Sequence, residues 1–386
     1  MKFANIIKTS ILGAAVIAAV GCNDAEYGTI DNRVYISEAS PAGLSHQQIE
    51  NLTISGELQT SIHVRLVKAI DRDVNVKIGF APEFLEEYNA TYQTSYAVIP
   101  DEYIELDREA VIKAGDLASD NINIKILPYP TDNGEAYCVP LKITDCDAPF
   151  GVAGKAGRII YILSAPHKQV VPSFNYQPSP SAEGDWGVET TEWTLEAWVY
   201  MSSFLINNQA IMSASIPDNA HGTEIYIRFG DADVPYNVLQ IKTGGTQFET
   251  NTVFNPYTWY HLAFTYANDL ATIYVNGVVD NQKSISVSQY IINNLSLCSS
   301  GSQYFKAQAR MAQVRFWKKA LSQNAIQDAM NRQVPSDSDG LIGYWKLDEG
   351  QGSTLYDSSP NERHMTCATT PTWITTEVDF SNPNGN

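Results

Sequence analysis

The chain has 386 residues, with 25 lysines and arginines against 43 aspartates and glutamates, and a formal net charge of −18. So acidic a protein repels nucleic acid and other polyanions, which excludes nucleic-acid binding and leaves neutral partners as the natural expectation. The length suggests two or three domains, and the apolar content is ordinary for globular proteins with a core.

Residues 1–21 have the layout of an export signal. Lys2 and Lys8 give a positive start, and residues 9–20 form an apolar run that is too short to span a bilayer. Small residues then lead to Cys22. An ordinary export signal needs no thiol at this point, although a cysteine could stand there by chance.

The sequence Ala-Val-Gly-Cys at 19–22 resembles the lipobox of bacterial lipoproteins, whose cysteine is alkylated with diacylglycerol before cleavage. The resemblance implies a signal peptide over residues 1–21, lipidation of Cys22 and a tether over residues 22–30. Asp24 and Glu26 resemble the acidic tags that send lipoproteins of polysaccharide-utilising Gram-negative anaerobes to the cell surface. We therefore expect an outer-membrane protein that faces the cell exterior and contacts the membrane only through its lipid.

Residues 31–165 alternate between apolar and polar positions as half-buried strands do. A helical interruption begins at Pro82 and extends to about residue 93, with Phe84, Leu85 and Tyr88 at helical spacing. The pattern predicts a β-sandwich with one short helix. The alternating segments are 62–66, 74–80, 122–126 and 139–143.

Three segments of this region resemble, in order, a domain of unknown function found at the N-terminus of surface lipoproteins in polysaccharide-utilising anaerobes. They are FLEEYNATYQTSYAVIPDEYIEL (84–106), AVIKAGDLASDNINIKI (110–126) and AYCVPLKITDCDAP (136–149). The resemblance implies an immunoglobulin-like (Ig-like) sandwich that acts as a spacer or adhesion module. It implies no catalytic residue.

Four prolines between residues 164 and 180 predict an interdomain linker over 166–180, part of it extended. The remaining region, 181–386, is again rich in strands. Asn276-Gly277 predicts a tight turn between two of them, and Ser322 can cap a short helix. The predicted strands cover 193–201, 223–230, 258–267, 271–279 and 309–317.

Four motifs in this second region resemble, in order, the laminin-G-like jelly roll of the concanavalin A type. They are WTLEAWVYM (193–201), WYHLAFTYANDLATIYVNG (259–277), VRFWKKALS (314–322) and GLIGYWKLDEGQGSTLYDSSPNERH (340–364). The expected fold is therefore all-β, an Ig-like β-sandwich followed by a concanavalin A-like jelly roll. The resemblance implies binding of carbohydrate or protein on the concave face or the rim loops.

Glucanases that share this jelly roll carry alternating acids on one strand, because retaining hydrolysis needs two carboxyl groups about 5–5.5 Å apart. The nearest pattern here is Glu183, Asp185 and Glu189, in which the last acid stands one residue too far along. We read it as a polar loop and assign no catalytic residue. His261 lies within a strand motif, which makes it a structural residue rather than a base.

Sugar rings stack on exposed aromatic side chains, so aromatic residues in loops are the candidate binding groups. Trp186, Tyr236 and Tyr304 have loop-like surroundings, although each could be an ordinary surface residue. The tryptophans on strand motifs are expected in the core: Trp193, Trp198, Trp259 and Trp345.

Calcium is the cofactor that the resemblance suggests, with Asp357 and Asn361 as candidate ligands in a loop that matches the family. Turn formation explains these two residues equally well. Where the family often has Asp-Glu, this chain has Ala312-Gln313, which removes two carboxylates.

The main hypothesis is a surface lipoprotein that binds a neutral glycan or polysaccharide without catalysis, within a polysaccharide-utilisation system. A second hypothesis is an adhesion or assembly protein that recognises a surface protein partner. The third and least favoured is a glycoside hydrolase.

Overall fold

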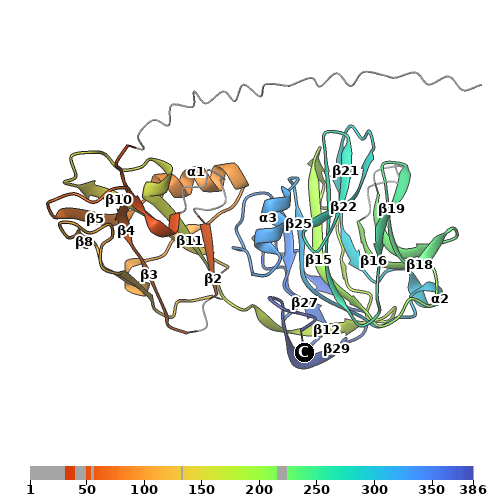
Figure 1. The fold of residues 1–386 in the computed structure, drawn as a ribbon. Coiled ribbons are helices and arrows are strands. Elements are labelled where there is room, and N and C mark those ends of the chain that lie inside the picture. Colours follow the sequence, from red (N-terminus) through yellow and green to blue (C-terminus); the bar gives the residue numbers. More distant parts are fainter. Residues whose placement is uncertain (1–30, 40–48, 54–55, 132–133, 215–223, 386) are drawn as a thin grey trace, which may run out of the picture.

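The computed structural model describes residues 31–39, 49–53, 56–131, 134–214 and 224–385. Cys22, the signal peptide and the tether lie outside these ranges. The described chain forms two β-domains, and almost all of its regular structure is strand, which confirms the all-β class (Figure 1). Among the described residues, no helix has the length and apolar character needed to cross a membrane.

The N-terminal domain is a sandwich whose two sheets share one core of branched aliphatic side chains, such as Val76, Leu141 and Ile124. One sheet has the order β2-β11-β10-β5-β8 with β6 beside β10, the other the order β3-β9-β7, and β1 pairs with β4. The strands are β1 (Val34–Ile36), β2 (Ile49–Thr53), β3 (Leu58–Ile62), β4 (Val64–Leu66), β5 (Val74–Phe80), β6 (Ala97–Val98), β7 (Ile104–Leu106), β8 (Glu109–Ile112), β9 (Ile122–Ile126), β10 (Tyr137–Cys146) and β11 (Arg158–Ser164).

The predicted helix is present as α1 (Pro82–Tyr92). A proline at its first turn costs nothing there, because that N–H has no partner within the helix. Phe84 and Leu85 are buried and pack on Cys138 and Ile160 of the larger sheet. The helix therefore covers the outer face of that sheet, and it ends where Gln93 takes a left-handed conformation.

The C-terminal domain is a jelly roll of two eight-stranded sheets. We call the first the helix-side sheet, because α3 (Gln323–Ala329) lies on it, and the second the far sheet, because it lies away from the N-terminal domain (Figure 1). The helix-side sheet comprises β22 (Val278–Ser284), β21 (Leu270–Val275), β20 (Trp259–Ala267), β15 (Trp193–Met201), β25 (Ala309–Trp317), β12 (Lys168–Phe174), β29 (Thr372–Asp379) and β26 (Leu341–Trp345).

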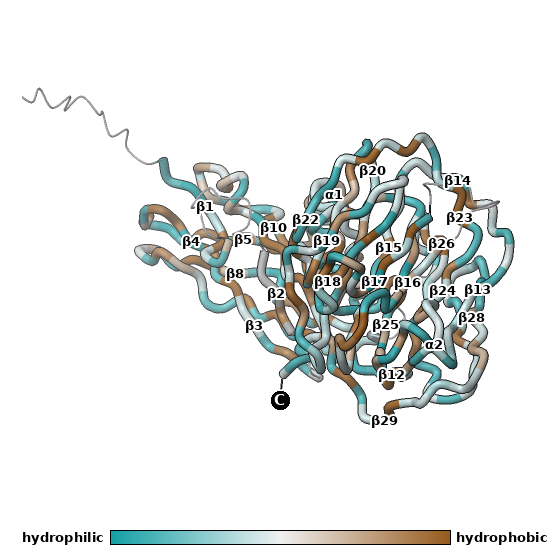
Figure 2. Tube along the Cα trace, turned by 90° about the vertical axis from the view of Figure 1, so that its right-hand side faces the viewer, coloured by the Kyte–Doolittle hydropathy of each residue, from teal (hydrophilic) through white to brown (hydrophobic). Residues whose placement is uncertain are grey.

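The far sheet comprises β19 (Thr246–Val253), β18 (Val234–Thr243), β17 (Ile225–Asp231), β16 (Gln209–Ala214), β24 (Leu295–Leu297), β13 (Ser181–Ala182), β28 (Met365–Thr366) and β27 (Thr354–Leu355). A small extra pair is formed by β14 (Val188–Thr190) and β23 (Tyr290–Ile292), and α2 (Gly301–Tyr304) is a single turn. Figure 2 shows hydrophobic segments within the strands and hydrophilic segments in many of the loops.

Side chains along β15 point alternately to the two faces of the helix-side sheet. Trp193 and Leu195 point into the core between the two sheets, together with Ile227 of β17. The residues between them point to the opposite face, which α3 covers with buried Ile326. Ser322 caps this helix as predicted, its hydroxyl accepting from the Ala325 N–H at 3.2 Å.

The structure shortens the predicted linker. Residues 168–174, expected within the linker 166–180, form β12 between β25 and β29. Val171 and Phe174 are fully buried. Pro172 is tolerated because the pairing with β29 contains a register shift and the pairing with β25 covers only two residues, so a missing N–H leaves few bonds unmade.

This boundary predicts different behaviour for two C-terminal fragments. A fragment of residues 166–386 should fold, because it keeps β12. A fragment of residues 181–386 loses β12 and the core side chain of Phe174, and removing a buried phenylalanine alone costs ~3–5 kcal/mol. Thermal unfolding followed by circular dichroism should give a much lower midpoint for the shorter fragment. Equal midpoints would place β12 outside the folding unit.

Candidate ligand-binding face

A row of polar side chains crosses the outer surface of the far sheet. Directly paired residues share one face of a sheet, and one series of pairs runs through all eight strands. Their neighbours along the strands, such as Ile227 and Ile241, belong to the core. The row therefore faces away from the core and presents hydroxyl, amide and ammonium groups. It consists of Thr354, Thr366, Ser181, Ser296, Ser213, Tyr226, Lys242 and Gln247.

Beside this row, Arg228 of β17 organises a polar cluster. Its Nε and Nη2 atoms donate to Oε1 of Gln240 at 3.1 and 2.8 Å, and Nη2 also pairs with Asp231. The arginine is mostly shielded from water, with 14% of its side chain exposed. Its charge is therefore compensated locally, and the cluster carries fixed hydrogen-bonding groups rather than a free positive charge.

Asn208 completes the cluster and leaves a donor free. Its Oδ1 accepts from the Tyr226 hydroxyl at 3.0 Å and from Nη1 of Arg228 at 3.2 Å. Burial raises the pKa of Tyr226, which keeps that hydroxyl protonated as a donor. Within the described part of the chain, the Nδ2 group of Asn208 has no hydrogen-bond partner of its own. This geometry fixes the amide plane and leaves its N–H groups for a ligand.

Two of the three aromatic residues singled out from the sequence lie beside this cluster. Tyr236 is 47% exposed, and its backbone crosses Gly230 so closely that a Cβ on that glycine would lie 3.0 Å from the Tyr236 Cα. Tyr304 ends α2 and is half-buried, and Ser300, just before this helix, accepts from the Ala210 N–H of β16 at 3.1 Å. The predicted pair therefore belongs to one end of the far sheet.

A third tyrosine at this end was not singled out from the sequence. Tyr257 is 69% exposed, and its loop is joined to β18 by hydrogen bonds between Phe254 and Asn237. Exposed Leu205 lies in the loop between β15 and β16, and exposed Val253 is the last residue of β19. The sequence Asn-Pro-Tyr-Thr at 255–258 has the loop composition that identified the other tyrosines, so the same criterion could have found it.

Trp186 differs from the prediction of an exposed ring. It is half-buried against the core of the jelly roll, and its ring stacks on Trp345 at a centroid distance of 6.2 Å. The guanidinium of Arg363 lies 4.7 Å from the centroid of the same ring. The flanking glycines suggested a free loop, but these two contacts occupy the indole, and Trp186 contributes packing rather than an open stacking surface.

Comparison with known families agrees with this architecture. Residues 175–327 match the family of the concanavalin A-like lectin/glucanases superfamily, and residues 30–149 match a family of N-terminal domains. The jelly roll is a concanavalin A-like domain. No curated protein matches the chain.

Two solved structures show different degrees of similarity to this chain. A protein of Bacteroides ovatus ATCC 8483, whose proposed role is carbohydrate binding, is 22% identical, with a TM-score of 0.56 over 89% of this chain and 98% of that one. An identity this low establishes a common fold and nothing further. EndoBT-3987 of Bacteroides thetaiotaomicron, solved with a Man5GlcNAc product, is 14% identical over 34% of this chain and 30% of that one, with a TM-score of 0.29.

The candidate calcium ligands of the concanavalin A-like domain are engaged in a turn. Asp357 is 5% exposed, and its two oxygens accept from the N–H groups of Tyr344, Ser359 and Arg363 and from the Ser359 hydroxyl, all at 2.8 Å. Asn361 donates to two backbone carbonyls. These contacts fit turn formation and not a cation site, and in the described ranges no group of three histidine, cysteine or acidic side chains could hold a metal.

The other predicted positions behave as structural residues. Glu183 and Asp185 are exposed in a loop, whereas Glu189 lies on β14 and accepts from Gln289. They therefore do not share one strand face, as a hydrolytic pair would need. The four tryptophans expected in the core are all buried: Trp193, Trp198, Trp259 and Trp345.

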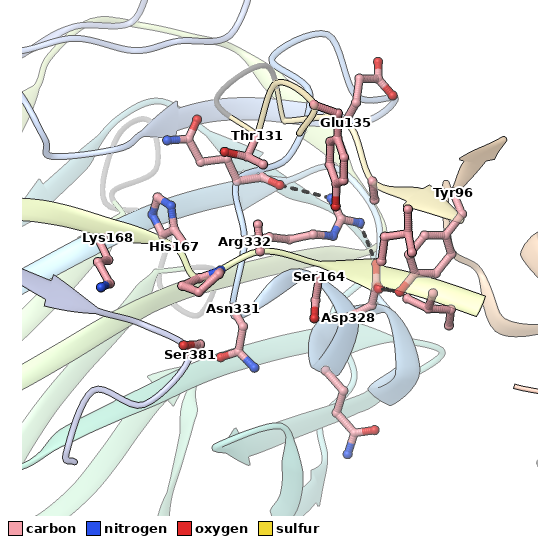
Figure 3. Close-up of a pocket in the computed structure, with 18 residues that line it drawn as sticks. Tyr96, Thr131, Glu135, Ser164, His167, Lys168, Asp328, Asn331, Arg332 and Ser381 are labelled. Atoms are coloured by element: carbon pink, nitrogen blue, oxygen red, sulfur yellow. Dashed lines mark hydrogen bonds and ion pairs between the residues drawn. The ribbon is translucent and has the colours of Figure 1, made fainter. Parts of the chain in front are cut away.

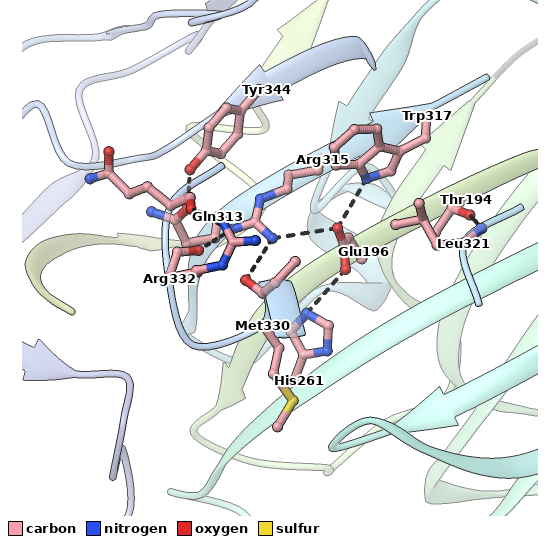
Figure 4. A network of polar contacts seen from close by, with 12 residues as sticks. Thr194, Glu196, His261, Gln313, Arg315, Trp317, Leu321, Met330, Arg332 and Tyr344 are labelled. Atoms are coloured by element: carbon pink, nitrogen blue, oxygen red, sulfur yellow. Dashed lines mark hydrogen bonds and ion pairs between the residues drawn. The ribbon is translucent and has the colours of Figure 1, made fainter. Parts of the chain in front are cut away.

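A buried carboxylate was missed by the sequence analysis. Glu196 of β15 is fully buried on the helix side of the sheet, where Trp317 donates to it at 2.9 Å (Figure 4). Arg315 lies 3.5 Å from the same carboxylate oxygen, and Nε2 of His261 lies 3.5 Å from the other oxygen. The sequence did contain a signal for this carboxylate, because Glu196 is the one acidic residue in the largely apolar strand segment 193–201.

This network is buried and cannot contact a substrate. Burial alone would raise the pKa of Glu196, but the hydrogen bond from His261 and the positive charge of Arg315 outweigh it, so the pKa lies below that of an ordinary glutamate. A carboxylate that stays ionised and has no exposed surface cannot act as an acid or base on a polymer. His261 is 1% exposed, in keeping with its structural interpretation.

Neutralising this carboxylate should therefore destabilise the domain. We expect Glu196→Gln to lower the free energy of unfolding by ~3–5 kcal/mol, because it leaves the Arg315 charge buried without its partner. Because the pKa of Glu196 is depressed in the folded state, its stabilisation is present above about pH 4.3 and is lost as the pH falls through the lower folded-state value.

Urea unfolding at several pH values measures both effects. Glu183→Gln is the matched control, since that glutamate is exposed, and it should leave stability nearly unchanged. Equal stability of the Glu196→Gln and Glu183→Gln variants would show that the buried ion pair contributes nothing.

Proposed function

We propose that this protein is a lipid-anchored surface protein that binds a neutral glycan without catalysis, on the far sheet of its concanavalin A-like domain. The observation that carries the proposal is the amide of Asn208, which is held in the Arg228 cluster beside exposed Tyr236 and donates to none of the described residues. Fixed hydrogen-bonding groups beside aromatic faces match a sugar, which has hydroxyl groups at its rim and C–H bonds on its faces.

Charge supports a neutral ligand rather than a polyanion. The chain carries a net −18, and Arg228 is already paired with Asp231. A sulfated or uronate-rich polymer would meet overall repulsion without a free cation in the cluster. The shared fold with a Bacteroides ovatus protein assigned a proposed role in carbohydrate binding is consistent with this ligand class.

The cellular setting of the proposal comes from the sequence. The lipobox-like residues at 19–22 and the acids after Cys22 support an anchor in the outer membrane, facing the exterior. In this setting the N-terminal sandwich would hold the jelly roll away from the membrane within a polysaccharide-utilisation system. Several anchored copies together would compensate for a weak single site.

A protein partner is the second candidate function, and one observation favours it. Leu205 and Val253 are 77% and 59% exposed at the same end of the jelly roll as Tyr257. Aliphatic side chains add contact area with an apolar protein surface but offer little to a sugar. Protein binding would therefore depend on Leu205, whereas glycan binding would depend on Asn208.

Glycan binding should depend on Tyr236 and not on an exposed tyrosine at the opposite edge of the far sheet. We expect Tyr236→Ala to weaken binding of a neutral glycan by about two- to tenfold, the equivalent of a lost stacking contact of ~0.5–1.5 kcal/mol. Tyr356→Ala is the matched control, because Tyr356 is 55% exposed but follows β27 at the opposite edge of the far sheet. Isothermal titration calorimetry with plant, mucin and yeast glycans measures the difference.

The same titrations separate the alternatives. Affinity should change little between low and high salt, since stacking is not screened as ion pairs are. Reducing ends released in proportion to the protein would make it a hydrolase. A Leu205→Ala variant that loses a protein partner, with no glycan bound by the parent chain, would favour adhesion instead.

The anchor has its own test. We expect Cys22→Ala to abolish incorporation of labelled lipid and to leave the protein soluble or as an uncleaved precursor, because the thiol alone accepts the diacylglycerol. Cys146→Ala, which changes a half-buried cysteine of the folded domain, should stay membrane-bound. Unchanged membrane partitioning of the Cys22→Ala variant would refute the lipid anchor.

A further inference from the structure

The two domains enclose a pocket of about 600 Å³ (Figure 3). Pockets for small ligands typically have volumes of about 300–1,000 Å³. The N-terminal domain contributes Tyr96 and Tyr129 to the walls, and the jelly roll contributes Asp328, Asn331 and Arg332. This interdomain cleft is separate from the far sheet, since its jelly-roll wall follows α3 on the opposite side of the domain.

Hydrogen bonds between the two domains hold the walls of the cleft together. The Tyr96 hydroxyl donates to Asp328, which also accepts from Nη2 of Arg332 at 2.5 Å (Figure 3). Nη1 of the same arginine reaches across to the backbone carbonyl of Gly134 at 3.3 Å. A Cβ on Gly134 would lie 2.5 Å from the backbone of Val334, so these two segments, one from each domain, are in direct contact. The cleft therefore has a defined width.

The jelly-roll wall of the cleft is fixed from beneath. Arg315 donates to the carbonyl of Ala329 at 3.0 Å and to that of Arg332 at 2.6 Å. The indole of Trp198 donates to the carbonyl of Met330 at 2.6 Å. Three carbonyls around Asn331 are thus held by side chains of the buried sheet face, which preorganises its amide at the cleft surface.

Several polar groups that make no hydrogen bond to the described residues face this space. The amide of Asn331 and the hydroxyls of Tyr129 and Thr131 make no hydrogen bond to the described residues, although all three line the pocket. None of them belongs to the fully buried polar atoms that lack a partner. They therefore offer hydrogen-bond donors and acceptors at the cleft surface.

The charges that line the cleft cancel. Glu135 and Asp328 are balanced by Lys168 and Arg332, and Asp328 and Arg332 are paired with each other. Burial lowers the pKa of His167, so this wall residue is neutral at physiological pH. A cleft whose lining charges sum to zero, with amide and hydroxyl groups that make no hydrogen bond to the described residues, suits a neutral polyhydroxylated ligand.

We propose that the interdomain cleft is a second binding site, which takes a neutral monosaccharide or the end of a neutral oligosaccharide between the two domains. The ligand class rests on the proposed glycan-binding function, but the site does not involve the far sheet. Asn331 and Tyr129 supply hydrogen bonds from opposite walls, so occupancy requires both domains.

Hydrogen–deuterium exchange and calorimetry on residues 22–386 test the site, with mannotriose, xylotriose and triacetylchitotriose as probes at millimolar concentration. We expect one of them to protect both 129–131 and 329–333, and the combined Asn331→Ala and Tyr129→Phe variant to lose at least tenfold in affinity at that site. Ser336→Ala, in the exposed loop beyond the cleft, should behave as the parent. Equal melting temperatures would show that all variants are folded.

The outcomes separate the two proposals. Cleft protection that persists in Tyr236→Ala supports the second site. Binding that disappears in Tyr236→Ala, without protection of the cleft, overturns the second site and leaves the far sheet as the binding face. Binding confined to the cleft overturns the far-sheet proposal instead. No heat and no protection with any probe overturns both.

Discussion

The buried guanidinium of Arg315 is the constraint on which the arrangement of the two domains depends. A charge without exposed surface is tolerated only where opposite charge and hydrogen-bond acceptors surround it. Glu196 supplies the charge, and the carbonyls of Ala329 and Arg332 supply acceptors. The segment after α3 is thereby fixed to the sheet, although it has no regular structure of its own beyond that helix.

Asp328 in the last turn of α3 and Arg332 in the segment after it reach Tyr96 and Gly134 of the N-terminal domain. A line of polar contacts thus runs from the core strand β15 to the surface of the neighbouring sandwich. An N-terminal domain that is joined in this way fixes the direction of the jelly roll, whereas a free linker would not. Because residues 168–174 form strand β12, the connection between the two domains is also shorter than the predicted linker.

Sequence patterns predicted the elements well where local chemistry decides them. The helix at Pro82, the cap at Ser322 and the strand at 193–201 follow from residue type and spacing. The exposure of Trp186 depends on Trp345 and Arg363, which are more than 150 residues away, and no local pattern contains that contact. The Glu196 network and the cleft were missed for the same reason, because their partners come from distant strands and from both domains.

The two faces of the jelly roll show why the far sheet is the better candidate for ligand binding. Both faces carry a cluster of an arginine, an acid and an amide. On the helix side, Glu196, Arg315 and Gln313 use their hydrogen-bonding groups on one another and on the chain that covers them. On the far sheet, Asn208 accepts two hydrogen bonds and still keeps its donors. A binding face needs polar groups that are held in place and still have donors or acceptors available for a ligand. In this domain the buried polar groups on the helix side bond to one another, whereas the Asn208 amide on the far sheet keeps donors that no described residue uses.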